Sequence, residues 1–318
     1  MRQENFRLFK LMRLLLALEV VVSHSSSYFF EKAWGGWIMA VPAFLGVSGF
    51  LVLHSYETTL IKKDFVKKRI LRIMPALFLS MCISAILLGK GYLEGSILIW
   101  LTGGMMLSQS GNVPLWSLLW EEIAYGFLFF AAKIYRQENR AYLLTLFAAS
   151  LGLGYFSEYF NFSPLFKIVS YLPSSFLMGN LIYIHRIKII FFSRKLGYWN
   201  WLLLVGVCLW SQLVYSKLAL TMPPFWLQTF AIIYVGLGDN FPLRMKLPDL
   251  SYGIYIYHMP LLNYFIKIPS TPLIDISTLL YSASLLSLCI FSWYLIEAPF
   301  LSLKIYFSSD FASKIRAD

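Results

Sequence analysis

The chain has 318 residues, of which 58% are hydrophobic and only 14% are charged. A soluble domain is about half apolar and a quarter charged, so this composition excludes an ordinary soluble enzyme and indicates a helical membrane protein. The net charge of +11 does not call for a nucleic acid partner, because Lys and Arg positions in a membrane protein report its topology. No His/Cys cluster with metal-ligand spacing is present.

The apolar runs predict an all-α polytopic bundle of about ten membrane spans, each near the roughly 20 residues that cross a bilayer. The predicted spans are 9–30, 36–56, 71–89, 115–134, 141–157, 165–185, 199–216, 222–238, 249–267 and 275–303. The segment 93–108 is apolar but interrupted by glycines, and we expect it to be interfacial or re-entrant. Glu297 and Pro299 are expected to stop the last helix. Lys and Arg collect in alternate loops, which places both termini in the cytoplasm and predicts one integral-membrane domain over 1–318.

The first span carries Arg13 and His24 within an otherwise apolar run. At about 100° per residue their spacing places both on one helix face, roughly 16 Å apart along the axis. Ionisable groups inside a span normally face a bundle interior or a wet cavity. His24 is therefore a candidate general base or proton relay. The competing interpretation is that the pair only joins helices through hydrogen bonds.

A basic stretch, KKDFVKKRILRIMP, is expected at 62–75 as a loop that leads into the third span. Arg69 and Arg72 are three residues apart, so they project from one side where the chain enters a helix. Paired guanidinium groups bind phosphate oxygens bidentately, which makes these two residues a candidate phosphate-binding pair. Simple positive-inside anchoring, or contact with anionic lipid heads, is the alternative.

The stretch NVPLWSLLWEEIAYGFLFF places Ser117, Glu121 and Tyr125 at intervals of four, on one helix face. A carboxylate at Glu121 can either orient an imidazole or bind a sugar hydroxyl. Glu122 lies one step round the helix and is the alternative acid. Two adjacent acids inside a span are costly, which argues against a purely structural role for both.

The late stretch LPDLSYGIYIYHMPL places Ser251, Tyr255 and His258 on one helix face in an i, i+4, i+7 pattern. These side chains either line the same cavity as the earlier polar groups or form a polar seam between two helices.

These stretches, in this order, resemble acyltransferase family 3, whose members are integral-membrane enzymes that acylate, often O-acetylate, bacterial cell-surface glycans. The residues that match the family's motifs are Arg13 with His24; PAFLGVSGFLV at 42–52; Arg69, Arg72 and Pro75; Trp116, Ser117, Leu118 and Glu121; Ser251, Tyr252, Tyr255 and His258; and Glu297 with Pro299. Two features depart from the pattern. Lys10 stands where many members have Asp, and no fused hydrolase-like domain is evident.

The resemblance implies an O-acetyltransferase of the bacterial inner membrane that draws on cytosolic acetyl-CoA or another acyl-CoA, without a permanently bound cofactor. The acceptor would be a hydroxyl of a glycan or lipid-linked glycan, such as lipopolysaccharide or capsule. Arg69 and Arg72 would hold the donor phosphates, and His24 would act as the base or carry the acyl group. Glu121 would orient His24 or the acceptor, while Arg13 would bind donor phosphate or stabilise charge on the thioester oxygen. The expected substrate-binding residues are Ser117, Glu122, Ser251, Tyr255 and His258.

Two other classes compete with the enzyme. A transporter or flippase for a polysaccharide precursor also suits intramembrane His and Glu, but no internal repeat is evident in the sequence. A non-catalytic scaffold or sensor explains the many intramembrane ionisable residues poorly.

Overall fold

The computed structural model of the protein consists, over the residues that it describes, almost entirely of helices. The described residues are 7–29, 38–59, 61–106, 111–135, 140–218, 222–238, 248–267 and 274–303. The all-α class predicted from the sequence is confirmed for these ranges. Both chain ends lie outside them, so their cytoplasmic placement stays a prediction. The chain divides into two compact units, which are taken here one at a time.

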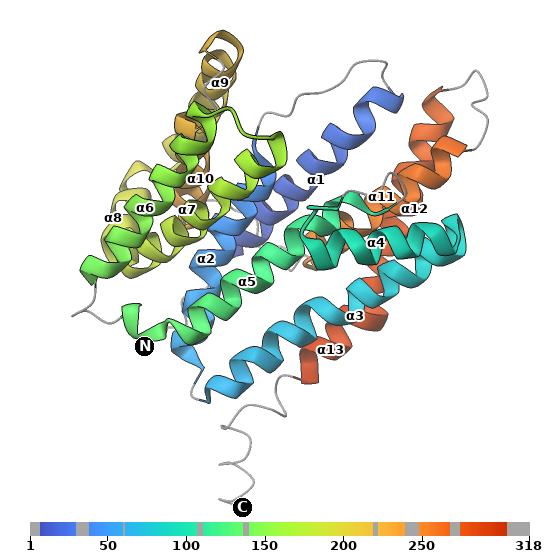
Figure 1. The fold of residues 1–318 in the computed structure, drawn as a ribbon, viewed down its shortest axis with the longest axis horizontal. Coiled ribbons are helices and arrows are strands. Elements are labelled where there is room, and N and C mark those ends of the chain that lie inside the picture. Colours follow the sequence, from blue (N-terminus) through green and yellow to red (C-terminus); the bar gives the residue numbers. More distant parts are fainter. Residues whose placement is uncertain are drawn as a thin grey trace, which may run out of the picture. The chain divides into compact units, whose positions relative to one another are not determined.

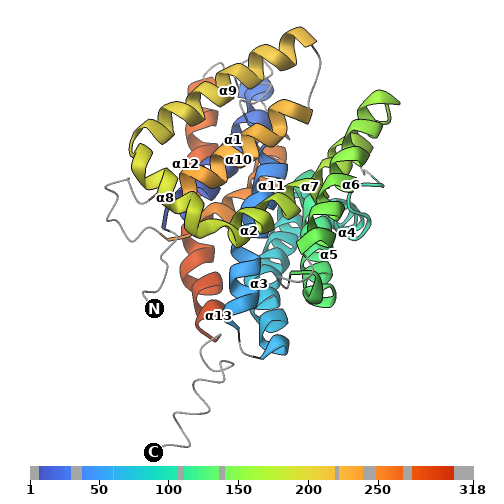
Figure 2. The same cartoon turned by 90° about the vertical axis from the view of Figure 1, so that its left-hand side faces the viewer.

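The first unit comprises Met1–Glu19, Gly36–His54 and Trp120–Leu247. Three helices begin in one unit and end in the other: α1 (Arg7–Phe29), α2 (Ala40–Thr58) and α5 (Trp116–Phe130). The remaining elements of the first unit are η2 (Ala132–Tyr135), α6 (Arg140–Tyr159), α7 (Pro164–Ile184), α8 (Arg186–Leu196), α9 (Trp199–Leu218) and α10 (Met222–Gly236). Within it, α6 packs along α7, and α9 runs beside α10 (Figure 2).

A glycine contact brings the backbones of α2 and α7 together in the first unit. A Cβ built on Gly179 of α7 would lie 2.0 Å from the carbonyl oxygen of Gly46, and one on Gly49 would lie 2.2 Å from the carbonyl oxygen of Phe176. Small residues at such crossings let membrane helices approach closely enough for backbone packing. The glycines of the phrase PAFLGVSGFLV are therefore explained by this helix contact.

Gly179→Ala is expected to destabilise the protein by about 1–3 kcal/mol, because the added methyl group meets backbone atoms that cannot turn away. The matched control is Gly206→Ala in α9, where a Cβ meets nothing within 4 Å. That control should be neutral or stabilising by about 0.5–1 kcal/mol. Thermal unfolding in detergent compares the two, and equal unfolding temperatures would contradict the close contact.

The second unit comprises Val20–Gly35, Ser55–Leu119 and Pro248–Asp318. Its own elements are α3 (Lys62–Leu88), α4 (Lys90–Thr102), η1 (Val113–Leu115), α11 (Ser251–Lys267), α12 (Ile274–Ser292), the π-helix η4 (Trp293–Glu297) and α13 (Ala298–Ser302). Figure 1 shows α4 alongside α3, and α12 alongside α11. Helix α3 also packs on α11, so these two helices form the centre of the unit.

The apolar segment 93–108 contributes only part of a short helix, α4, which ends at Thr102. Gly103 terminates it in the left-handed conformation, with φ of 58°, and its amide donates to carbonyl oxygens of the last turn. A left-handed cap is the role in which glycine carries no steric penalty. The glycines therefore interrupt the helix, whereas the interfacial or re-entrant placement of 93–108 stays a prediction. Residues 107–108 lie outside the described part.

Two expectations about helix limits are wrong, and one helix was not predicted. The basic stretch is helical from Lys62 onward and forms the first turns of α3, because Lys and Arg are good helix formers. A helix that the sequence did not indicate, α8, occupies Arg186–Leu196. The last helix does not stop at Glu297, since α13 continues to Ser302. Pro299 is tolerated there because it lies in the first turn of α13, where its missing amide hydrogen costs nothing.

Among the described residues, three helical segments are long and apolar enough to cross a membrane: Lys62–Leu88, Pro164–Ile184 and Ile276–Ser302. Two shorter apolar helices cover Trp199–Val214 and Pro224–Gly236. The helices therefore support a membrane protein, while the full count of about ten spans stays a prediction.

Candidate active site

Helix α11 carries the polar stretch LPDLSYGIYIYHMPL. A side chain from outside the helix binds it at the point where a proline interrupts its hydrogen bonds. Pro260 lies inside the helix and has no amide hydrogen, so the carbonyl oxygen of Ile256 one turn earlier loses its usual donor. The fully buried side chain of Asn112 supplies a replacement, with Nδ2 2.8 Å from that oxygen. In an apolar bundle an unmet carbonyl costs free energy, so this contact fixes α11 against the segment that leads into α5.

Ser117 and Tyr255 meet next to this anchor. Their hydroxyl oxygens are 2.7 Å apart, and the Tyr255 hydroxyl also lies 3.0 Å from the carbonyl oxygen of Pro114. The two residues come from stretches that the sequence singled out separately. The structure thus brings the start of NVPLWSLLWEEIAYGFLFF and the stretch LPDLSYGIYIYHMPL together within the second unit.

His24 of α1 and His258 of α11 lie in contact within the second unit. Nδ1 of His24 lies 3.1 Å from Nε2 of His258. His258 is fully buried, whereas His24 is only partly buried and keeps some of its surface accessible. A general base or nucleophile is commonly a histidine whose second ring nitrogen is held by a hydrogen bond. His24, in contact with the buried ring of His258, has this arrangement.

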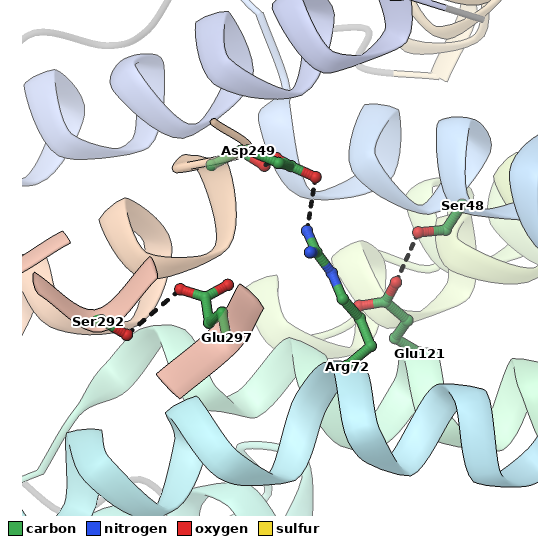
Figure 3. A network of polar contacts seen from close by, with 7 residues as sticks. Ser48, Arg72, Glu121, Asp249, Ser292 and Glu297 are labelled. Carbon is green, nitrogen blue, oxygen red and sulfur yellow. Dashed lines mark hydrogen bonds and ion pairs between the residues drawn. The ribbon is translucent and has the colours of Figure 1, made fainter. Parts of the chain in front are cut away.

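Arg72 is joined to Asp249, a residue that precedes α11 (Figure 3). Its Nη2 lies 2.6 Å from Oδ2 of Asp249. The other carboxylate oxygen of Asp249 accepts a hydrogen bond from the hydroxyl of Ser251 at 2.6 Å. Arg69, one turn earlier on α3, donates from Nη2 to the hydroxyl of Ser55 at 3.0 Å. Both guanidinium groups of the predicted phosphate-binding pair therefore lie on α3, and Arg72 already neutralises a carboxylate.

Glu121 belongs to the first unit and accepts two hydrogen bonds there. The Ser48 hydroxyl of α2 donates to its Oε1 at 2.5 Å (Figure 3). The Tyr125 hydroxyl donates to the same oxygen. The contact with Tyr125 confirms the helix face expected from the spacing of four residues. Glu122 and Arg13 are partly buried on α5 and α1. The relation of Glu121 to His24 stays a prediction, because the two residues belong to different units.

Glu297 is nearly fully buried at the end of the π-helical segment (Figure 3). The Ser292 hydroxyl donates to its Oε1 at 3.3 Å and lies 2.8 Å from the hydroxyl of Tyr257. The hydroxyl of Tyr257 also lies 3.3 Å from the carbonyl oxygen of Ala76 in α3. This acid is therefore part of a buried polar chain joining α12, α11 and α3, and π-helical turns of this kind are frequent at functional sites.

Sequence reasoning missed three residues that hold the predicted groups within their own units: Ser48 in the first unit, and Asp249 and Asn112 in the second. A signal existed for Ser48, which is the polar residue of PAFLGVSGFLV, and for Asp249, which stands two residues before Ser251. Asn112 gave no signal, because its partner is a backbone oxygen exposed by a distant proline.

Over the described residues, these features define a class of protein: a helical membrane protein that carries hydrogen-bonded and ion-paired groups between its helices. The chain belongs to acyltransferase family 3, since the model of that family, described as an acyltransferase domain, matches residues 8–298. The protein is therefore an acyltransferase, and family membership favours the enzyme over the transporter and the scaffold.

Two curated relatives match almost the whole chain. Nodulation protein 10 of Rhizobium leguminosarum bv. viciae is 27% identical, with 93% of each chain covered. An O-acetyl transferase of Shigella phage Sf6 is 26% identical, with 91% of this chain and 94% of the relative covered. No solved structure matches.

Proposed function

We propose that this acyltransferase is an O-acetyltransferase that moves an acetyl group from cytosolic acetyl-CoA to a hydroxyl of a cell-surface glycan or lipid-linked glycan. The observation that carries the proposal is the contact between the accessible His24 and the buried His258 in a chain of the acyltransferase family. The relative named O-acetyl transferase supports the same reaction for this chain.

In the proposed reaction a ring nitrogen of His24 takes the proton of the acceptor hydroxyl while the hydroxyl oxygen attacks the thioester carbonyl. Collapse of the tetrahedral intermediate breaks the carbon–sulfur bond. The proton on His24 then passes to the departing CoA sulfur, which leaves an acetyl ester and free CoA. In the alternative order, His24 itself attacks the thioester and carries the acetyl group to the acceptor.

The charged groups fit the donor that we propose. Arg69 and Arg72 lie one turn apart on α3 and present guanidinium donors suited to the phosphates of acetyl-CoA. Arg13 would add a further donor for a phosphate or for the thioester oxygen. Ser117 and Tyr255 would contact the acceptor through their paired hydroxyls. Glu121, with Glu122 as the alternative, would orient the acceptor or His24.

The proposal includes a topology. About ten spans with both termini in the cytoplasm of a bacterial inner membrane would let one domain, 1–318, meet a cytosolic donor and an acceptor on the outer side. The segregation of Lys and Arg to alternate loops supports this orientation.

Deleting the gene and comparing the mass of the cell-surface glycan tests the reaction. We expect a loss of one acetyl mass unit per modified residue, restored when the gene is supplied again. Unchanged glycan and glycolipid masses, with the protein present in the membrane of the parent strain, would contradict the proposal.

A further inference from the structure

The tautomer of His258 is determined by its own helix. Nδ1 of His258 lies 3.1 Å from the carbonyl oxygen of Ile254 and 2.8 Å from that of Tyr255. A carbonyl oxygen only accepts hydrogen bonds, so Nδ1 must carry the proton. In a neutral imidazole the other nitrogen is then an acceptor. Full burial keeps water from competing for either atom.

The acceptor nitrogen of His258 fixes the partner ring in turn. Since Nε2 of His258 has no proton to give, Nδ1 of His24 must be the donor across their 3.1 Å contact. The geometry suits this bond. The ring planes differ by only 16°, and the ring centroids are 5.3 Å apart, so each nitrogen lies on the line between the rings. The hydrogen therefore points along the lone pair of the acceptor.

With Nδ1 of His24 committed as a donor, its Nε2 holds the free lone pair. We propose that His258 is a positioning residue, which holds His24 in the tautomer whose Nε2 takes the acceptor proton or attacks the thioester. This inference rests on the proposed role of His24 in acyl transfer. The sequence suggested that His258 contacts the substrate. The inference instead assigns it the role of orienting His24.

The arrangement does the work of the carboxylate that orients histidine in a hydrolase triad, but with a neutral acceptor. As His24 gains a proton in the transition state, its Nδ1–H continues to donate to His258, and the pair carries a single positive charge. A carboxylate in the place of His258 would be charged even before the donor binds. The neutral ring of His258 avoids that buried charge, which suits a site between membrane helices.

Solid-state ¹⁵N NMR of the full protein in bilayers, labelled only at histidine, tests the tautomer directly. The chain has four histidines, so His54→Gln and His185→Gln identify two of the signals and leave those of His24 and His258. We expect both remaining rings to show a protonated Nδ1 and an unprotonated Nε2 in the wild-type protein. A protonated Nε2 in either neutral ring would overturn the proposal without any variant of the pair.

Activity variants test the consequence. His258→Gln keeps an acceptor oxygen near His24 Nδ1 and should retain kcat within about threefold. His258→Leu has a similar size but no acceptor, and its kcat should fall at least tenfold with little change in the KM for acetyl-CoA. Equal kcat in the two folded variants would overturn the positioning role. An active His24→Ala variant would instead refute the proposed role of His24 in acyl transfer. An inactive His24→Ala variant, together with the opposite tautomer of His24 in the wild-type protein, would refute this inference alone.

Discussion

Replacing His24 by alanine is expected to reduce acyl transfer by about 10²–10⁴-fold, because a positioned base contributes a rate factor of this size. Removal of the ring also takes the donor away from Nε2 of His258, which is fully buried. A buried acceptor left without its donor costs about 1–3 kcal/mol, so alanine alone mixes a chemical loss with a structural one.

His24→Gln separates the two losses. Its side-chain amide can still donate to His258, but it has no basic nitrogen. We expect His24→Gln to be as inactive as His24→Ala and more stable in detergent. His185→Ala is the matched control, since His185 is exposed and forms the end of α7. The measurement is incorporation of radiolabelled acetyl groups into membrane glycan at equal protein levels. Appreciable activity in His24→Gln would remove His24 from the chemistry.

Helical periodicity predicted the pairings that lie along one helix. The spacing of Glu121 and Tyr125, and that of Tyr255 and His258, depends only on the turn of the helix, and the structure has both pairs on helix faces. Hydropathy likewise indicated most of the helices, because an apolar run of this length has few other stable forms.

Partners across helices could not be predicted in the same way. Asp249 lies before α11 in an irregular segment, so no period relates it to Arg72. Ser48 stands in a glycine-rich stretch that is typical of helix packing. Its hydrogen bond to the Glu121 carboxylate depends on the packing of α2 against α5, which no sequence period reports. The error at Glu297 has a similar cause. An acid followed by a proline usually ends a helix, but here a π-helical turn shifts the proline into the first turn of the next helix.

Arg72→Ala is expected to lower the stability of the folded protein and to raise the KM for acetyl-CoA. Arg72 and Asp249 form an ion pair of 2.6 Å whose side chains are 16% and 10% exposed. Removing one partner of such a buried pair costs about 3 kcal/mol or more, because the remaining carboxylate keeps its charge in an apolar setting. The KM for acetyl-CoA should also rise about tenfold if the guanidinium holds a phosphate, which corresponds to roughly 1.4 kcal/mol.

The double variant Arg72→Ala with Asp249→Asn distinguishes these effects. It removes the stranded charge while an amide can still accept from Ser251, so most of the lost stability should return. The KM for acetyl-CoA should remain raised, because no guanidinium has been restored. Arg69→Ala gives the comparison within the same helix. Arg69 donates to the neutral Ser55 hydroxyl, and loss of this hydrogen bond should lower stability by about 1 kcal/mol, while the KM for acetyl-CoA should rise. Thermal unfolding and donor saturation curves measure the two quantities separately. A double variant that recovers a normal KM would make Arg72 a structural residue and leave donor binding to other groups.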